Sequence, residues 1–131
     1  MSVTAAQLAA PSHTCIHFTD KAPPSAELAG MGLFVADIGG GAVHTEEELF
    51  QAVAGAFRFP DYFGNNWDAL DECLRDLDWL SGESGYVLIV RNSEHQWRGH
   101  NRMSGRFHAS WSLAGEEWAA REKPFHLVYE W

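Results

Sequence analysis

Three carboxylates recur at every fourth position between residues 68 and 76, and they are the side chains of this chain best placed to do chemistry. Asp68, Glu72 and Asp76 are spaced i, i+4 and i+8, which puts them on one side of a helix that advances about 100° per residue. Because they form one ridge and do not face each other across a cleft, the pattern favours binding of cationic groups over acid–base catalysis. The opposite side carries the residues expected in a core, namely Trp67, Leu70, Cys73, Leu74 and Leu77.

Such a row is unfavourable for the helix itself. Like charges at i, i+4 destabilise a helix by roughly a few tenths of a kcal/mol per pair. The helix dipole offsets part of this for Asp68 and Asp71 near the N-terminus, but not for Asp76 or Asp78. Arg75 is the only basic residue in the segment. A solvated helix face is the plain interpretation, and a surface complementary to a positively charged partner is the functional one.

The turn before the helix favours the functional interpretation. Pro60 fixes φ and disfavours helix just before it. The pair Tyr62–Phe63 places two rings beside Gly64, whose backbone can adopt conformations closed to other residues. Either Asn65 or Asn66 caps the helix. A cap needs only one asparagine and a turn needs no aromatic pair, so this composition indicates a binding surface.

The turn and helix together resemble the signature of the barstar family, intracellular inhibitors of the ribonuclease barnase. The resemblance extends more weakly over residues 32–131, and residues 1–30 lie outside it. It implies that the acidic helix and its preceding loop plug the active site of a basic ribonuclease, with the acids standing in for substrate phosphates. The matching residues are Tyr62-Phe63-Gly64, Asn66, Asp68-Ala69-Leu70, Cys73 and Leu74.

The resemblance also implies roles for individual positions. Asp68 and Glu72 match the two helix acids that pair with cationic groups of the nuclease. Tyr62 matches a loop aromatic, Asn66 a loop residue whose backbone lies at the interface, and Glu117 a glutamate from the last helix. Trp79 and Trp97 are the tryptophans expected at the exposed rim. The expected partner-binding residues are Tyr62, Asn66, Trp67, Asp68, Asp71, Glu72, Asp76, Trp79 and Glu117.

Several positions depart from the family pattern. Position 72 is Glu where barstar has Asp, Asp71 replaces a tryptophan of the binding helix, and Trp67 replaces a leucine. The alignment of the last helix is loose, so Glu116 would serve as well as Glu117. These departures indicate a relative of barnase or a different basic toxin as the partner. The alternative hypothesis is therefore a barstar-fold binding module for another basic protein.

The charge balance agrees with a protein partner. The 131 residues include 18 Asp and Glu against 9 Lys and Arg, a formal net charge of −9. Contacts to nucleic-acid phosphates require Lys and Arg, so we expect no nucleic-acid ligand, whereas a negative field accelerates the approach of a basic protein. Acidity for solubility alone is the simpler explanation of the charge. We expect a monomer when free, without a cofactor.

Other features carry less chemistry. His13 and His17 are the one pair of the seven histidines with the His-x-x-x-His spacing, and two histidines alone are too few ligands for a metal site. His95 and His100 lie five apart in a polar stretch, and we expect no metal site. Gly39-Gly40-Gly41 lacks the Lys-Ser/Thr ending of a phosphate loop and predicts a tight turn. A metal-dependent enzyme that uses the acids and histidines is the third hypothesis.

The chain carries no evident targeting or membrane segment. No apolar stretch approaches the roughly 20 residues of a membrane helix, and the first basic residue is Lys21. Cys15 and Cys73 do not make a disulfide framework. We therefore expect a cytoplasmic protein.

The order of apolar segments predicts an α/β fold: a small three-stranded parallel sheet with right-handed crossovers, packed with three to four helices. The barstar-like domain is expected at residues 31–131 and an N-terminal extension at residues 1–30. In the extension, residues 1–12 are expected to be disordered and 21–30 to form a loop, with residues 15–18 open as a further edge strand. Strands are expected at 33–38, 86–90 and 124–131, and helices at 45–57, 67–80, 94–97 and 107–118.

Overall fold

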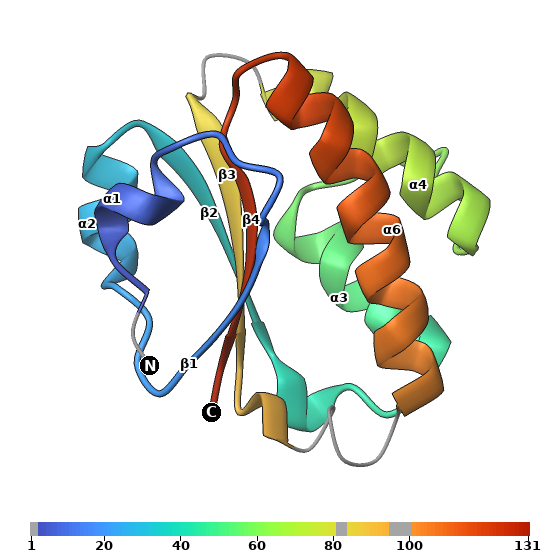
Figure 1. Cartoon of the computed structure of the whole chain (residues 1–131). Helices are drawn as coiled ribbons and strands as arrows, with labels where there is room; N and C mark the ends of the chain where they lie inside the picture. Colours follow the sequence, from blue (N-terminus) through green and yellow to red (C-terminus); the bar gives the residue numbers. More distant parts are fainter. Residues whose placement is uncertain (1–2, 81–83, 95–100) are drawn as a thin grey trace.

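Four parallel strands form one sheet in the order β1-β4-β3-β2, with helices on both faces (Figure 1). The computed structural model describes residues 3–80, 84–94 and 101–131. The strands are β1 (Ile16–Thr19), β2 (Leu33–Gly39), β3 (Gly85–Arg91) and β4 (Phe125–Glu130). The helices are α1 (Ala5–Leu8), α2 (Ser25–Gly30), α3 (Glu46–Ala56), α4 (Trp67–Asp76) and α6 (Asn101–Ala120), with 3-10 turns at Gly40–Ala42 and Asp78–Leu80.

The prediction of an α/β fold with a parallel sheet is confirmed, but its element count is wrong. The sheet has four strands instead of three, and the described residues contain five helices instead of three to four. The additional strand is β1, which pairs with β4 from Ile16 opposite Leu127 to Thr19 opposite Glu130. The short helix expected at 94–97 falls on residues that lie mostly outside the described ranges.

The expectations of disorder at 1–12 and of a loop at 21–30 are wrong where α1 and α2 form. Thr4 caps α1 with a capping box, accepting from the Gln7 N–H while the Gln7 side chain accepts from the Thr4 N–H. Helix α2 starts directly after Pro24, whose fixed φ suits the start of a helix. Both helices are short and gain their stability from packing, which local sequence does not reveal.

The chain direction explains why helices occupy both faces. The steps from β2 to β3 to β4 move across the sheet in one direction, and α3, α4 and α6 lie on one face (Figure 1). The step from β1 to β2 runs the opposite way across the sheet. A right-handed crossover in that direction places α2 on the other face, together with α1.

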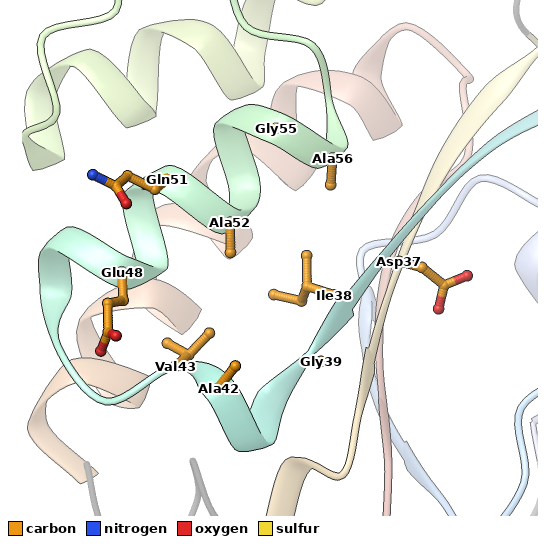
Figure 2. Close-up of a pocket in the computed structure, with 10 residues that line it drawn as sticks. All are labelled: Asp37, Ile38, Gly39, Ala42, Val43, Glu48, Gln51, Ala52, Gly55 and Ala56. Carbon is orange, nitrogen blue, oxygen red and sulfur yellow. The ribbon is translucent and has the colours of Figure 1, made fainter.

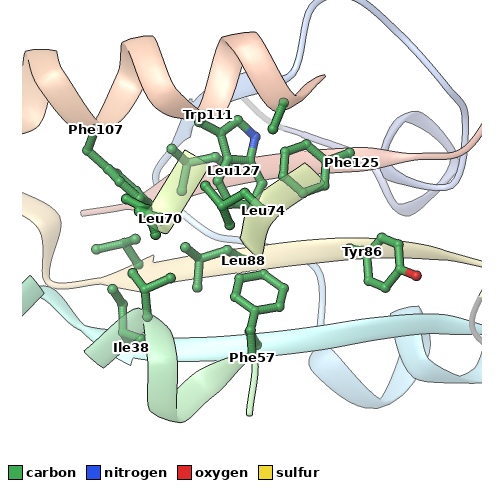
Figure 3. Packing of buried hydrophobic residues seen from close by; sticks show 14 of the residues in the cluster. Ile38, Phe57, Leu70, Leu74, Tyr86, Leu88, Phe107, Trp111, Phe125 and Leu127 are labelled. Carbon is green, nitrogen blue, oxygen red and sulfur yellow. The ribbon is translucent and has the colours of Figure 1, made fainter. Parts of the chain in front are cut away.

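Two hydrophobic cores result, one on each face. The larger lies under α3, α4 and α6, where Leu70 and Leu74 of α4 pack among Phe107, Trp111 and Leu88 (Figure 3). The smaller lies beneath the extension. Its buried residues are Leu8, Ala22, Leu28, Leu33, Val87, Ile89 and Val128.

Candidate protein-binding site

Helix α4 has one buried and one exposed side, as its spacing predicted. The exposed side carries three carboxylates, which we call the acidic face: Asp68, Glu72 and Asp76. The helix lies on the outer side of the α3–α4–α6 layer, away from the extension (Figure 1). Its buried side chains, each at most 4% exposed, are Leu70, Cys73 and Leu74.

Asp68 and Glu72, the first two acids of the acidic face, have no counter-ion within the described residues. Across residues 3–80, 84–94 and 101–131, neither Asp68 nor Glu72 makes an ion pair or a side-chain hydrogen bond. Arg75, the only basic residue of α4, contacts Glu117 instead, with Nη1 3.4 Å from Oε2. Four residues of helix separate the two acids by about 6 Å along the axis. They can therefore address two neighbouring cations of a partner.

The turn before α4 is organised by its two asparagines. Asn66 is the cap: its Oδ1 accepts from the Ala69 N–H at 2.8 Å, and its Nδ2 donates to the Gly64 carbonyl at 3.3 Å. Asn65 adopts the left-handed conformation, with φ 51°. Gly64, whose backbone is free to adopt this conformation, does not have a positive φ. A Cβ at Gly64 would lie 3.1 Å from Asn66 Nδ2, so the small residue leaves room for the capping side chain.

Tyr62 is the most exposed large side chain of this turn, with 73% of its surface accessible. Partial desolvation, the nearby Cys73 thiol and the carboxylates of Asp76, Asp78 and Glu72 raise the pKa of Tyr62. The ring is therefore near the C-terminal half of the acidic face. It offers an apolar surface and a hydroxyl beside the carboxylates.

The helix ends earlier than predicted, and this brings two more acids together. Leu77 is buried in a left-handed conformation with φ 53°, so α4 stops at Asp76 and does not continue to residue 80. Partial desolvation, a hydrogen bond that protonated Asp76 donates to the Asp78 carboxylate, and the negative charge of Asp78 raise the pKa of Asp76. The exposed Asp78 thus extends the negative surface beyond the helix end.

The two tryptophans predicted at the site, Trp67 and Trp79, both pack against α3 and the residues that follow it. Trp67 is half-buried, donates from Nε1 to Glu46 Oε2 at 2.6 Å and meets Phe50 edge-on. Trp79 is also half-buried and donates from Nε1 to the Phe57 carbonyl at 2.8 Å. Only part of each ring is open to a partner. Trp97 lies outside the described residues.

Asp71 lies on α4, and Glu117 lies on α6, where it pairs with Arg75 of α4. Asp71 is half-buried, and its Oδ1 is buried without a hydrogen-bond partner among the described residues. Glu117 is 45% exposed and pairs with both Arg75 and Arg121. Burial raises the pKa of the Cys15 thiol, and the charge of Glu116 adds to this effect. Glu116 therefore lies near Cys15, on the β1 side of α6. Of the two glutamates considered for the site, Glu117 is the one beside α4.

One concave surface lies apart from the acidic face. A groove of about 660 Å³ between β2 and α3 is lined mainly by small and apolar residues (Figure 2). Its charged lining residues are Asp37 and Glu48. The Asp37 side chain points away from the groove and pairs with Arg91, while Glu48 accepts hydrogen bonds from His44 and Thr45 at the start of α3. This lining does not assemble an acid–base pair.

Histidines gather in one place on the opposite face of the sheet. His17 Nε2 lies 2.9 Å from His126 Nδ1, and His126 is 1% exposed. Within the part of the chain that the structure describes, no three His, Cys, Asp or Glu side chains are arranged to hold a metal ion. His95 and His100 lie outside that part. None of the described helices combines the length and apolarity needed to cross a bilayer.

Sequence reasoning missed the contacts that fix the acidic helix from outside. Glu46 to Trp67 and Glu117 to Arg75 join residues that are 21 and 42 positions apart. No local pattern encodes such pairs. The only available signal was the i, i+4 spacing of Glu117 and Arg121, which favours a pair on one face of α6.

Comparison with known proteins places this geometry in a family. The family model described as Barstar (barnase inhibitor) matches residues 33–130, which is most of the chain. The matched segment contains α4, the turn before it and Glu117. No curated protein matches the chain.

Proposed function

The chain belongs to the barstar family, and on this basis we propose that it is a protein inhibitor that occludes the active site of a basic ribonuclease. The observation that carries the proposal is the acidic face. Asp68 and Glu72 stand exposed and without an internal counter-ion, on a helix whose other side is fixed in the core. That arrangement suits a cationic, phosphate-binding cleft.

In the proposed complex the protein performs no catalysis. Asp68 and Glu72 take the place of substrate phosphates and pair with cationic groups of the nuclease, while Tyr62 packs beside them with its exposed ring. Asn66 presents its turn backbone, and Asp76 extends the negative surface. The net charge of −9 draws a basic partner toward this face and accelerates association. Such an inhibitor acts in the cytoplasm, before a secreted nuclease leaves the cell.

The alternative partner is a basic toxin domain without ribonuclease activity. Asp71 stands where the family pattern has an aromatic residue, and its half-buried carboxylate adds charge next to Arg75. This difference alters the surface offered beside Asp68 and Glu72. It favours a partner whose cleft differs from that of barnase, within the same mode of binding.

The double variant Asp68→Ala/Glu72→Ala tests the proposal. Loss of two charge-assisted contacts is expected to weaken binding to a basic ribonuclease of the barnase type by at least about 100-fold. The matched control is Asp20→Ala/Glu27→Ala, which removes the same charge from exposed positions of the extension. Inhibition of RNA cleavage and association kinetics at low and high salt provide the readouts.

Stability separates the possible outcomes. The double variant is expected to fold with unchanged stability, because two small effects oppose each other. Relief of the Asp68–Glu72 repulsion stabilises the helix, and loss of the Asp68 interaction with the helix dipole destabilises it, each by roughly a few tenths of a kcal/mol. Unfolding of the variant would make the row structural. Full inhibition by a folded double variant would place the interface elsewhere. Binding of a basic toxin but of no ribonuclease would select the alternative.

A further inference from the structure

Arg75 is a cation built into an otherwise acidic helix. Glu72 precedes it by three residues and Asp71 by four, and side chains at these spacings are neighbours on a helix surface. A guanidinium on a flexible stem at this position can reach the Glu72 carboxylate. If it did, it would neutralise one of the two acids on which the proposed function rests.

The structure shows the guanidinium held elsewhere. Arg75 Nε donates to the main-chain carbonyl of Asp71 at 3.1 Å, and Nη1 lies 3.4 Å from Glu117 Oε2 on α6. Both side chains are partly open, with 38% of Arg75 and 45% of Glu117 exposed. The internal counter-charge of Arg75 is therefore a residue of another helix, on the side of α4 away from Asp68 and Glu72.

The surrounding contacts fix Glu117 where it can do this. Arg121 lies four residues after Glu117, directly after the end of α6, with Nη2 3.9 Å from Glu117 Oε1, and its Nη1 donates to the Arg75 carbonyl at 3.2 Å. The Arg121 guanidinium lies 4.5 Å from the centre of the Trp118 ring. Trp118 in turn donates from Nε1 to the Leu74 carbonyl at 2.7 Å. Trp118 and Arg121, at and just after the end of α6, thus donate to main-chain carbonyls in the last turn of α4. These carbonyls have no partner within α4 itself.

We propose that Glu117 is a positioning residue that draws Arg75 toward α6 and so keeps Asp68 and Glu72 available for a cationic partner. This inference rests on the proposed function and assigns Glu117 a role that acts through Arg75. It differs from the role implied by resemblance, in which this glutamate touches the nuclease itself. The two roles make opposite predictions for a double-mutant cycle.

The position of Arg75 can be tested without any partner. In Glu117→Gln, we expect nuclear Overhauser contacts between the Arg75 side chain and Glu72 to appear, and exchange of the Arg75 Nε proton to accelerate. Glu116→Gln is the matched control, because it removes the same charge from the next residue of α6, on the β1 side. It should leave both signals as in the wild type. If the Arg75 signals in Glu117→Gln stay unchanged, the proposal is wrong.

The consequence for binding can be tested with barnase as the probe. Exposed ion pairs contribute up to about 1 kcal/mol, which corresponds to a roughly two- to fivefold change. We therefore expect Glu117→Gln to slow association about two- to fivefold at low salt, and Glu116→Gln to slow it less. In the Arg75→Gln background, Glu117→Gln should have no further effect beyond that of Glu116→Gln.

The outcomes distinguish this inference from the proposed function. An equal effect of Glu117→Gln with and without Arg75 would show direct contact with the nuclease and overturn the positioning role. If the wild-type chain does not bind barnase, the proposed function fails for that enzyme. The nuclear Overhauser comparison then still decides whether Glu117 holds Arg75 away from Glu72.

Discussion

A pair of histidines beneath the N-terminal extension makes stability depend on pH. His126 Nε2 lies 2.8 Å from the Ala10 carbonyl, which can only accept, so this nitrogen carries the proton. Its Nδ1 is then an acceptor, and His17 Nε2 donates to it at 2.9 Å. The chain of bonds joins the segment after α1 to β1 and β4. In this arrangement both rings are neutral, and protonation of His126 at Nδ1 would set two donors against each other unless His17 changed its tautomer.

The expected size of the effect follows from His17. Burial, followed by the neighbouring His126, lowers the pKa of His17 from 6.5 to about 4. Burial also lowers the pKa of His126, against the opposing hydrogen bond to Ala10. Such a pKa difference for His17 corresponds to at most about 3 kcal/mol. Because His17 is only half-buried and solvent screens part of the effect, we expect about 1–2 kcal/mol.

The sign follows from proton uptake. The folded pKa of His17 is depressed, so the unfolded chain binds a proton first as the pH falls below 6.5. The contribution of His17 is therefore fully present above pH 6.5 and is lost as the pH falls toward about 4. Acidification over this window should destabilise the protein and loosen the extension.

Urea unfolding at pH 7.0 and 4.5 tests this with His17→Gln, whose amide can still donate to His126 but does not titrate. The variant should lose about 1–2 kcal/mol less stability than the wild type between the two pH values. His13→Gln, at an exposed position, is the control and should behave as the wild type. Carboxylates titrate in all three proteins and cancel in the comparison. An equal loss in His17→Gln and wild type, or titration of His17 near 6.5 by NMR, would refute the reasoning.

Two further predictions concern the extension and the cap of α4. Leu28→Ala should lower the free energy of unfolding by about 2–5 kcal/mol, because Leu28 is fully buried in the core of the extension face. Leu113→Ala, at a position 48% exposed, should change it by less than about 0.5 kcal/mol; similar values for the two would contradict the packing of the extension. Asn66→Ala should destabilise the protein by about 1 kcal/mol through loss of the cap, and Asn66→Asp should retain most of it. Urea denaturation measures both, and an Asn66→Ala variant as stable as Asn66→Asp would count against the cap.

The main core was readable from sequence because its elements are strongly patterned. Residues 86–90 are continuously apolar, and β3 is buried along that whole run. The same run also indicated that a second layer had to cover the sheet, since Val87 and Ile89 point away from α4. The extension was the only uncommitted part of the chain that could supply this layer. Its helices escaped prediction because each offers a single fully buried leucine, Leu8 or Leu28, and too few residues for a period.

The acidic face could be predicted from the sequence for the same reason, but the contacts of the residues around it could not. A spacing of four residues places Asp68, Glu72 and Asp76 together in any helix. The direction of Arg75 depends on Glu117, which only the packing of α6 against α4 brings close. The helix end depended on Leu77, whose buried side chain favours a left-handed turn over one more residue of helix.

The proposed binding side of α4 and the side that stabilises the fold are different. A short helix with like charges at i, i+4 would fray if propensity alone held it. Here the start of α4 is fixed by the Trp67 bond to Glu46, and its last turn by the Trp118 bond to the Leu74 carbonyl. Carboxylates held in this way are in position before a partner arrives, so association loses less free energy to ordering. The apolar side and the two ends of the helix thus supply the stability that the acidic side removes.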